Sequence, residues 1–346
     1  MVAKDQNLKI IFKGCLEFGS TKSYDKVFKM YERRIENYYK TDVILKEEDL
    51  FDEASACINL PRIVLYSTLK KWKATVSLLE YLSQFAIAGE LSGWLIENGK
   101  IIEYVIIEPH SDKVAVKAFL KGRELIQTEG KEKEAMDALN IAINKYERHA
   151  QAYERRGFIN YQLKNFNDAL YDFTKSINIY QNNPDPYFGR ANIYILKGEL
   201  DKAIEDLDQC IKKSIPLQPI YWKARRIKGE CLAKKGAYKA AALEFKLFTQ
   251  RKFAVGDSNY KWKKYVFTKY GQTLLELENY QEAVVAFNEA VKLEQSTAEK
   301  VKEADPLLYR GIALQKSGQK GFVNDWIQAA ELGSKEAVQL MEEFSQ

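Results

Sequence analysis

The spacing of apolar residues changes character near residue 110. Before this point, runs with a period of two alternate with runs of helical period. Residues 8–18 alternate loosely between apolar and polar side chains and predict a strand. Residues 23–40 place their apolar side chains on one helical face, and Ser23 is a suitable N-cap. The chain is therefore expected to begin with a strand followed by a helix.

The next part of the chain continues this mixture. Residues 63–66 predict a strand, and residues 72–89 predict a second apolar helix. The dipeptide Asn98-Gly99 divides two β-rich runs over residues 94–107 and indicates a type I′ hairpin turn. We therefore expect residues 1–110 to form a small α+β domain with three to five strands and two helices. No motif in residues 1–110 assigns this domain to a known family.

From residue 111 the apolar pattern is helical and repeats every 34 to 42 residues. The second half of each repeat contains a small residue: Ala135, Ala169, Ala203, Ala241 and Ala283. A bulky residue follows four positions later: Leu139, Phe173, Leu207, Phe245 and Phe287. The first half contains its own small residue: Gly157, Ala191, Gly229, Gly271 and Gly311. Small residues let two antiparallel helices approach, and a bulky residue one turn later fills the groove between them.

This pattern resembles the tetratricopeptide repeat (TPR) family over about residues 116–346. The resemblance implies a mainly α fold, a right-handed solenoid of about six repeats over residues 111–346. The last repeat is atypical, because Val323 stands where the small residue is expected. Residues 334–344 predict a helix that caps the array. Extra residues enter around 215–219 and 251–262, and insertions of this kind often lie on a binding face.

The amino-acid composition disfavours several classes of function. The chain has only two histidines, His110 and His149, and four dispersed cysteines, so metal, cofactor and catalytic motifs are not expected. His149 is interpreted as the C-terminal end of a helix, where it complements the helix dipole. Hydrophobic residues make up 46% and charged residues 29% of the chain, and no membrane-spanning or signal segment is visible. We expect a cytoplasmic, non-enzymatic protein with reduced thiols.

The net charge of +5 conceals a strongly basic segment. Residues 211–270 contain sixteen lysines and arginines against three acidic residues, a net charge of +13, so the remainder carries −8. Aromatic residues are interleaved with these cations. Such a segment attracts an acidic partner, and a basic patch with accessible aromatics also binds single-stranded nucleic acid.

The TPR resemblance also indicates which residues line the concave groove. If the small residue of each first helix is numbered eight, positions two, five, nine and twelve face the groove. The candidate partner-binding residues are Phe158, Tyr161, Phe188, Asn192, Lys223, Arg226 and Tyr265, with Arg225, Lys261 and Lys263 from the basic segment. Asn192 and Arg226 match the carboxylate clamp of some family members. Phe188 and Glu230 depart from it, so a complete clamp is not predicted.

These features predict an adaptor that binds a protein or peptide segment, most simply an acidic one, through the groove and the basic fourth and fifth repeats. Two alternatives remain open at this point. The same patch suits an RNA- or DNA-associated factor, and an enzyme site in residues 1–110 is disfavoured by the absence of motifs. The sequence leaves the oligomeric state open.

Overall fold

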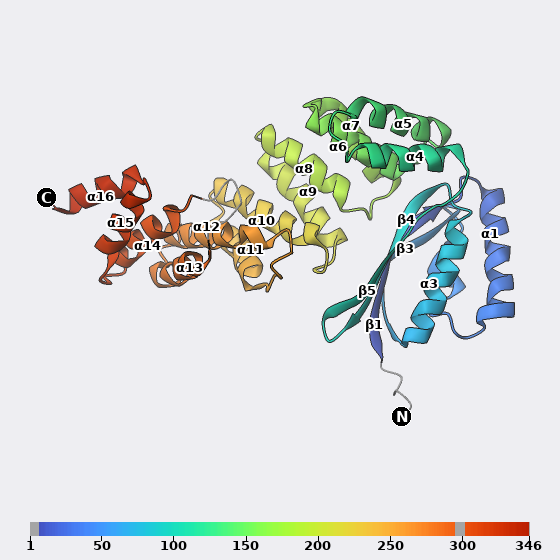
Figure 1. Ribbon diagram of the computed structural model, residues 1–346, viewed down its shortest axis with the longest axis horizontal. Coiled ribbons are helices and arrows are strands. Elements are labelled where there is room, and N and C mark those ends of the chain that lie inside the picture. The colour runs from blue at the N-terminus through green and yellow to red at the C-terminus, as the bar shows by residue number, and fades with distance from the viewer. Residues whose placement is uncertain (1–6, 295–301, 346) are drawn as a thin grey trace. The chain divides into compact units, whose positions relative to one another are not determined.

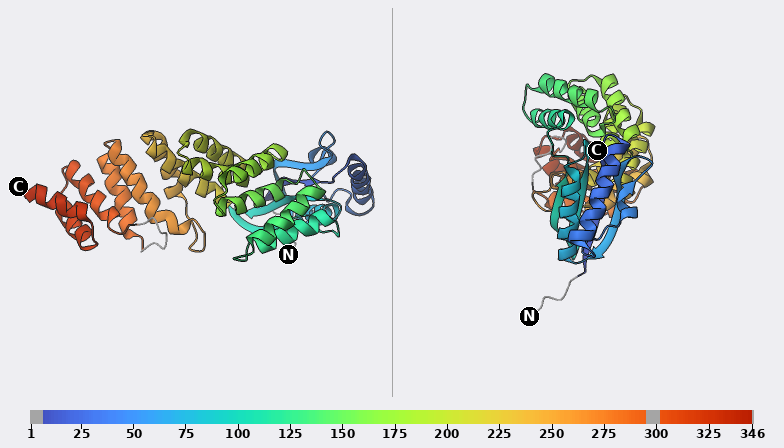
Figure 2. Two further views of the ribbon diagram at one scale, coloured as in Figure 1. Left: turned by 90° about the horizontal axis from the view of Figure 1, so that it is seen from above. Right: turned by 90° about the vertical axis from the view of Figure 1, so that its right-hand side faces the viewer.

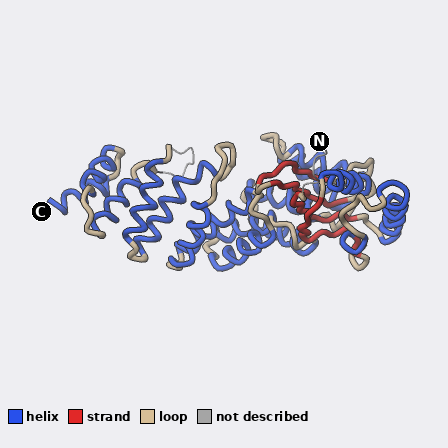
Figure 3. Tube along the Cα trace, turned by 90° about the horizontal axis from the view of Figure 1, so that it is seen from below, coloured by secondary structure: helices blue, strands red, loops and turns tan. Residues whose placement is uncertain are grey.

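The structure is a computed structural model that describes residues 7–294 and 302–345 (Figure 1). The chain divides into two compact units, Met1–Gly189 and Arg190–Gln346. The predicted domain boundary after residue 110 lies inside the first unit. Strands occur only in the N-terminal part of the described chain, and the rest is helical (Figure 3). The predicted combination of a small α+β domain and a helical repeat array is confirmed.

The first unit opens with a five-stranded antiparallel sheet of order β2-β3-β1-β4-β5. Its strands are β1 (Leu8–Glu17), β2 (Phe51–Asp52), β3 (Cys57–Ser67), β4 (Ala88–Glu97) and β5 (Lys100–Ile107). Its helices are α1 (Thr21–Arg34), the π-helical turn η1 (Ile35–Tyr39), α2 (Glu47–Leu50) and α3 (Leu69–Ser83). The helices α1 and α3 lie on the same side of the sheet (Figure 1). Phe12 and Trp72 stack at 5.0 Å in the core between sheet and helices.

Two helix boundaries differ from the sequence prediction. The N-cap of α1 is Ser20 rather than Ser23, because the Ser20 hydroxyl accepts the Ser23 backbone N–H at 3.2 Å. The second helix ends at Ser83 rather than near Gly89, which belongs to β4. Gly89 has φ +101°, and a Cβ there would lie 2.1 Å from the Cys15 carbonyl oxygen. This glycine therefore serves a close approach of two strands.

The predicted hairpin turn is confirmed. Asn98 and Gly99 have φ of 49° and 77°, as a type I′ turn requires, and they join β4 to β5. Gly14 on β1 has the same lack of space for a side chain as Gly89, because a Cβ at Gly14 would lie 2.0 Å from the Glu90 carbonyl oxygen. The strand register shifts at this point, between Phe12 and Gly14. The two glycines thus let β1 and β4 come together beside the first repeats.

In its described residues the array contains six helix pairs and a final single helix, which follow one another in sequence (Figure 2). The first two pairs are α4 (Val114–Leu125) with α5 (Glu132–Lys145), and α6 (Ala150–Gln162) with α7 (Phe166–Ile179). The next two are α8 (Asp185–Leu196) with α9 (Leu200–Lys213), and α10 (Pro219–Lys234) with α11 (Tyr238–Gln250). The last are α12 (Lys263–Glu276) with α13 (Tyr280–Lys292), and α14 (Asp305–Lys316) with α15 (Phe322–Glu331). The predicted final helix is α16 (Lys335–Ser345), and a short 3-10 turn, η2 (Tyr260–Trp262), precedes α12.

The small residues of the first helices pack directly on the bulky residues of the second helices. A Cβ on Gly157 would lie 3.0 Å from Phe173, and one on Gly229 would lie 2.6 Å from Phe245. Gly271 has the same relation to Phe287 at 2.5 Å. The small–bulky rule predicted from the sequence is therefore a direct contact in these repeats. In the last pair Trp326 fills this place, and Val323 is exposed because α15 begins late, at Phe322.

A recurring ion pair, not predicted from the sequence, links the two helices of four repeats. A cation immediately before the small residue of the first helix meets a buried carboxylate of the second helix. The pairs are Arg156–Asp172 at 2.6 Å, Arg190–Asp206 at 2.8 Å, Lys228–Glu244 at 2.8 Å and Arg310–Asp325 at 2.5 Å. We call these four pairs the intra-repeat ion pairs.

Arg156, Arg310 and Lys228 also reach the second helix of the preceding repeat. Arg156 donates to Asn140 at 2.7 Å, Arg310 donates to Asn288 at 3.0 Å, and Lys228 pairs with Asp208 at 2.6 Å. Each of these three cations therefore links the two helices of its own repeat and also connects that repeat to the preceding one. The fifth repeat differs, because the cation position holds Tyr270. Its hydroxyl donates to Glu282 at 2.6 Å, and Glu282 also meets Lys246 of the fourth repeat at 3.2 Å.

Candidate functional site

The groove positions of the second repeat lie against the sheet. The Gln151 side chain accepts the Gly89 backbone N–H at 3.1 Å and donates to the Glu90 carboxylate at 3.4 Å. Beside it, the Tyr146 hydroxyl donates to Glu17 at 2.9 Å, and Arg148 lies 3.5 Å from the same carboxylate. The chain's own sheet thus covers the groove at Gln151. A ligand cannot reach this position while β4 occupies it.

This covered part of the groove carries an excess of carboxylates. Glu154 is buried and contacts Arg155 at 3.3 Å. Burial raises the pKa of Glu154 to about 7. The charge of Arg155 opposes this rise, and the carboxylates of Asp185 and Glu90 add to it. Burial also raises the pKa of Glu90, with Glu108 and Asp185 contributing. The beginning of the groove is therefore unsuited to an acidic ligand.

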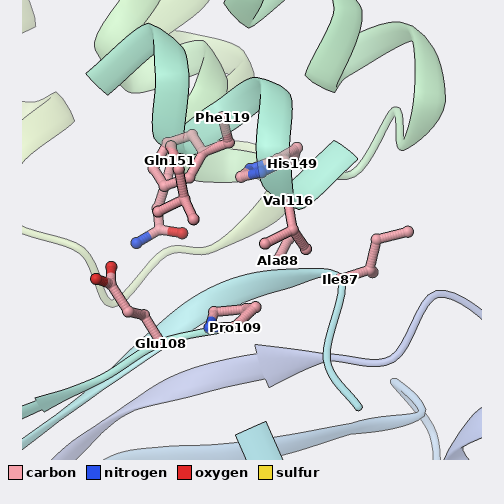
Figure 4. Close-up of a pocket in the computed structure, with 9 residues that line it drawn as sticks. Ile87, Ala88, Glu108, Pro109, Val116, Phe119, His149 and Gln151 are labelled. Atoms are coloured by element: carbon pink, nitrogen blue, oxygen red, sulfur yellow. The ribbon is translucent and has the colours of Figure 1, made fainter. Parts of the chain in front are cut away.

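A small pocket of about 200 Å³ of empty space, part of it open to solvent, lies between β4 and the first repeats (Figure 4). Its lining is mostly apolar: Ile87, Ala88, Pro109, Val116, Phe119 and Leu120, with Glu108, His149 and Gln151. The polar ends of Gln151 and Glu108 lie on the same side of it (Figure 4). The space that a water-sized molecule can occupy in it is only about 10 Å³, far below the ~300–1,000 Å³ of ordinary ligand sites. We assign it to packing rather than to binding.

His149 has a different role from the one expected. It is the N-cap of α6 rather than the end of a helix, because its Nδ1 accepts the Ala152 backbone N–H at 3.3 Å. The ring is buried against Phe119, with ring centroids 4.6 Å apart. Burial lowers the pKa of His149 to about 4. The folded state thus holds the neutral imidazole.

This histidine should make the first unit less stable in mild acid. Because the folded pKa of about 4 lies below the unfolded value near 6.5, the unfolded chain binds the proton first as pH falls. The contribution of neutral His149 to the free energy of unfolding is complete above pH 6.5 and is lost as the pH falls from 6.5 to 4. Between pH 7 and pH 5 the loss is about 2 kcal/mol. Urea unfolding of wild type and His149→Gln at both pH values measures it, and the variant should lack this part of the pH dependence. An equal pH dependence in both proteins would contradict the assignment.

The predicted aromatic groove residues differ in accessibility. Phe158 is 40% exposed, whereas Phe188 is buried. Tyr161 is half-buried and lies 6.1 Å from Phe166, ring to ring. In the second unit, Asn192 is half-buried on α8. Phe158 is therefore the predicted apolar contact that presents most surface.

In the second unit, the predicted anchor Arg226 is already engaged. It is 3% exposed, and its guanidinium donates to Glu230 at 2.5 Å. The same group lies 3.9 Å from the centre of the Trp262 ring. Tyr265 is also buried, and burial followed by the charge of Glu230 raises its pKa. Arg226, Trp262, Glu230 and Tyr265 form one cluster, and we call it the Arg226 cluster.

Much of the predicted basic patch is neutralised in the same way. At least six of the sixteen cations of residues 211–270 form ion pairs inside the second unit: Arg225, Arg226, Lys228, Lys235, Lys246 and Lys264. Glu244 alone serves two of them, with Arg225 at 2.5 Å and Lys228 at 2.8 Å. A count of charges along the sequence therefore overstates the field that this segment presents to a partner.

The insertion at residues 251–262 places exposed lysines beside the Arg226 cluster. Asn259 is buried and donates to the Pro219 carbonyl oxygen at 3.1 Å, which fixes the loop on the start of α10. Lys261 and Lys263 flank Trp262 in sequence, and Lys223 lies one helical turn before Arg226. Lys223 and Lys261 are exposed, and Lys263 is half-buried. The contact between Trp262 and Arg226 thus brings these three predicted residues to one region.

The aromatic residues of this segment are buried or half-buried. Phe253 is buried against Phe248, at 4.9 Å, and lies 5.7 Å from Trp222. The Trp222 indole donates to the Pro216 carbonyl oxygen at 2.8 Å. Stacking on nucleic-acid bases needs open aromatic faces. The packing therefore favours the charge of this region, rather than its aromatics, as the means of recognition.

Within residues 7–294 and 302–345, no helix has both the length and the apolar character that crossing a membrane requires. In the same residues, His, Cys, Asp and Glu side chains do not gather into a group that could hold a metal ion.

Tetratricopeptide repeat models match the chain at residues 173–205 and 265–297. No curated protein sequence matches it significantly. Among solved structures, YrrB is similar, described as a TPR protein with an unusual peptide-binding site. It has 14% identity and a TM-score of 0.51, and the match covers 60% of this chain and 99% of YrrB. The PilF protein of Pseudomonas aeruginosa is also similar, with 14% identity, a TM-score of 0.50, and coverage of 67% and 98%. At these identities the likeness concerns the fold.

Proposed function

Because the chain is a tetratricopeptide repeat protein, we propose that it is a non-enzymatic adaptor that holds an acidic protein or peptide segment. Repeats of this family support a role in protein interaction in general. The proposed site consists of the exposed Lys223 and Lys261 with the half-buried Lys263, and we call these three residues the lysine site. Its place beside the Arg226 cluster is the observation that carries the proposal.

The groove positions of each unit support this placement. In the first unit, β4 covers the groove at Gln151, and the surrounding carboxylates repel an acidic ligand. In the second unit, the groove face of α10 and the 251–262 loop expose cations. Arginine and lysine side chains bind carboxylates by charge-assisted hydrogen bonds. YrrB, a structural relative, has a peptide-binding site, and this agrees with a peptide as the ligand.

A nucleic-acid partner is less well supported than an acidic peptide. Phe253 and Tyr265, two aromatics of the basic segment, are buried and offer no open face for base stacking. We also propose a cytoplasmic location, the expectation drawn from the four dispersed cysteines of the sequence.

The experiment compares binding of a fluorescein-labelled Glu-rich peptide with binding of a Gln-rich peptide of equal length. The triple variant Lys223→Glu, Lys261→Glu, Lys263→Glu should weaken binding of the Glu-rich peptide at least tenfold. A control variant with the same charge change, Lys212→Glu, Lys234→Glu, Lys239→Glu, should change it less than twofold. Arg226 is left intact, since its loss would leave Glu230 unpaired.

Equal weakening by both triple variants would reduce the effect to net charge and contradict a defined site. A labelled single-stranded RNA of 20 nucleotides serves as the competing ligand. If the RNA binds more tightly than the Glu-rich peptide, with the steep salt dependence of phosphate contacts, the nucleic-acid function replaces the adaptor function.

A further inference from the structure

The edge strand β5 exposes an unusual amount of apolar surface. Ile102 is 52% exposed, Tyr104 is 47% exposed and Ile106 is 51% exposed. On its inner side β5 pairs with β4, and Tyr104 stacks on Trp94 at 5.2 Å. Across the described residues, no backbone hydrogen bond is made on its outer side. An open, apolar edge of this kind is a template for another strand.

The opposite edge of the sheet is protected where β5 is not. Beyond its short pairing with β2, the strand β3 carries Pro61 and Arg62. Proline removes a backbone donor, and a charged side chain at an edge disfavours further pairing. The strand β5 contains no proline, and its charges are Lys100, at its first residue, and Glu103. Because the β3 edge disfavours further pairing and β5 lacks these features, β5 is the edge better suited to pair with another strand.

The sequence of β5 is nearly symmetric about Tyr104. It reads Ile-Ile-Glu-Tyr-Val-Ile-Ile over residues 101–107. Antiparallel pairing of two copies about a two-fold axis at Tyr104 would place Ile102 opposite Ile106 and Ile101 opposite Ile107. The same register would place Lys100 opposite Glu108, whose carboxylate already binds Arg123 at 3.0 Å and has capacity for a second cation. Apolar side chains thus meet apolar ones except at Glu103, which lies opposite Val105, and opposite charges meet at both ends.

We propose that β5 pairs with β5 of a second copy of this chain, in antiparallel register about Tyr104, and forms a dimer with one continuous ten-stranded sheet. Such a two-fold contact is self-complementary and closes on itself, so it stops at two copies. Backbone hydrogen bonds supply the affinity, and the alternate side chains set the register. An edge contact is smaller than the ~1,600 Å² of a standard interface, so the dimer is weak.

Sedimentation velocity from about 1 to 500 µM tests the association. The weight-average sedimentation coefficient should rise with concentration toward that of a dimer. Tyr104→Lys should raise the dissociation constant at least tenfold, because two lysines would face each other across the axis. Val64→Lys, on the exposed part of β3, is the matched control and should leave the constant within twofold. A coefficient that stays constant over the whole range, or equal losses in both variants, overturns the proposal.

Disulfide trapping tests the register without relying on a loss of binding. Residues directly opposite in an antiparallel pair have Cα atoms about 4.5–5.5 Å apart, which suits a disulfide. Tyr104→Cys should give a covalent dimer under mild oxidation, and the four native cysteines are buried. Ile102→Cys alone should cross-link at least tenfold less, but it should form a mixed disulfide with Ile106→Cys. Efficient self-linking of Ile102→Cys would overturn the register. A negative result in the sedimentation and cross-linking experiments would leave the proposed lysine site unaffected, because that site lies in the other unit.

Discussion

Replacing Asp172 by alanine should destabilise the first unit by about 3–5 kcal/mol. The carboxylate of Asp172 is 1% exposed and accepts from Arg156 Nε at 3.0 Å, Arg156 Nη2 at 2.6 Å and Asn160 at 3.0 Å. Its removal leaves a half-buried guanidinium without its counter-ion, and Arg156 is the group that ties the second repeat to Asn140. Urea unfolding followed by circular dichroism measures the change. Asp168→Ala, an exposed position on the same helix, is the control and should change stability by less than about 0.5 kcal/mol.

The double replacement Arg156→Met with Asp172→Leu should recover most of this loss. Burial raises the pKa of Asp172 in spite of the opposing guanidinium, so the pair does not fully offset the desolvation of its carboxylate. Replacing both partners of a buried ion pair by apolar residues is often neutral or stabilising. If the double variant is as unstable as Asp172→Ala, the ion pair itself contributes net stability and this account is wrong.

The second large effect is expected from adding one methyl group to α10. In Gly229→Ala the new Cβ would lie 2.6 Å from the buried ring of Phe245. Overpacking of this kind costs about 1–3 kcal/mol, and the better helix propensity of alanine offsets about 0.5–1 kcal/mol. The variant should therefore be less stable in urea unfolding. Gly256→Ala, with nothing within 4 Å of its Cβ position, should be within about 0.5 kcal/mol of wild type.

The third repeat supplies a rescue for this variant. It carries Ala191 and Leu207 at the two positions that Gly229 and Phe245 occupy in the fourth repeat. Adding Phe245→Leu to Gly229→Ala reproduces that natural combination and should restore at least half of the lost stability. A further loss in the double variant would show that the two positions do not act through direct contact.

The repeats could be predicted because their pattern is local. Gly271 and Phe287 lie 16 residues apart on two adjacent helices, so their sizes alone reveal the packing. The same is true of Asn98-Gly99, since its positive φ values depend on the residue types in the turn. The end of the second helix was less predictable. The close approach of Gly89 to Cys15 that marks β4 joins residues 74 positions apart and has no local signal.

The candidate site was only partly predictable, because charge pairing depends on the fold. The sequence shows that Arg225, Arg226 and Lys228 are cations, but it does not show that Glu230 and Glu244 neutralise them. A signal for the intra-repeat ion pairs was present in the sequence. The cations at 156, 190, 228 and 310 recur directly before the small residue, and acidic residues recur 15 or 16 positions later. The sequence prediction placed His149 at the end of a helix, whereas it caps the start of α6. The two positions are easily confused because α5 ends at Lys145, only a few residues before α6 begins.

The departure of the fifth repeat from this ion-pair series bears on how the array responds to salt. In a repeat array each repeat interacts mainly with its neighbours, so stability behaves as a one-dimensional chain of couplings. Lys246 and Glu282, which couple the fourth repeat to the fifth, have side chains 49% and 38% exposed. Lys228 and Glu244 are only 17% and 8% exposed. Salt screens the exposed pair far more than the buried ones. High ionic strength should therefore weaken the electrostatic coupling between the fourth and fifth repeats more than the ion pair within the fourth repeat, while the apolar packing of α11 on α12 remains.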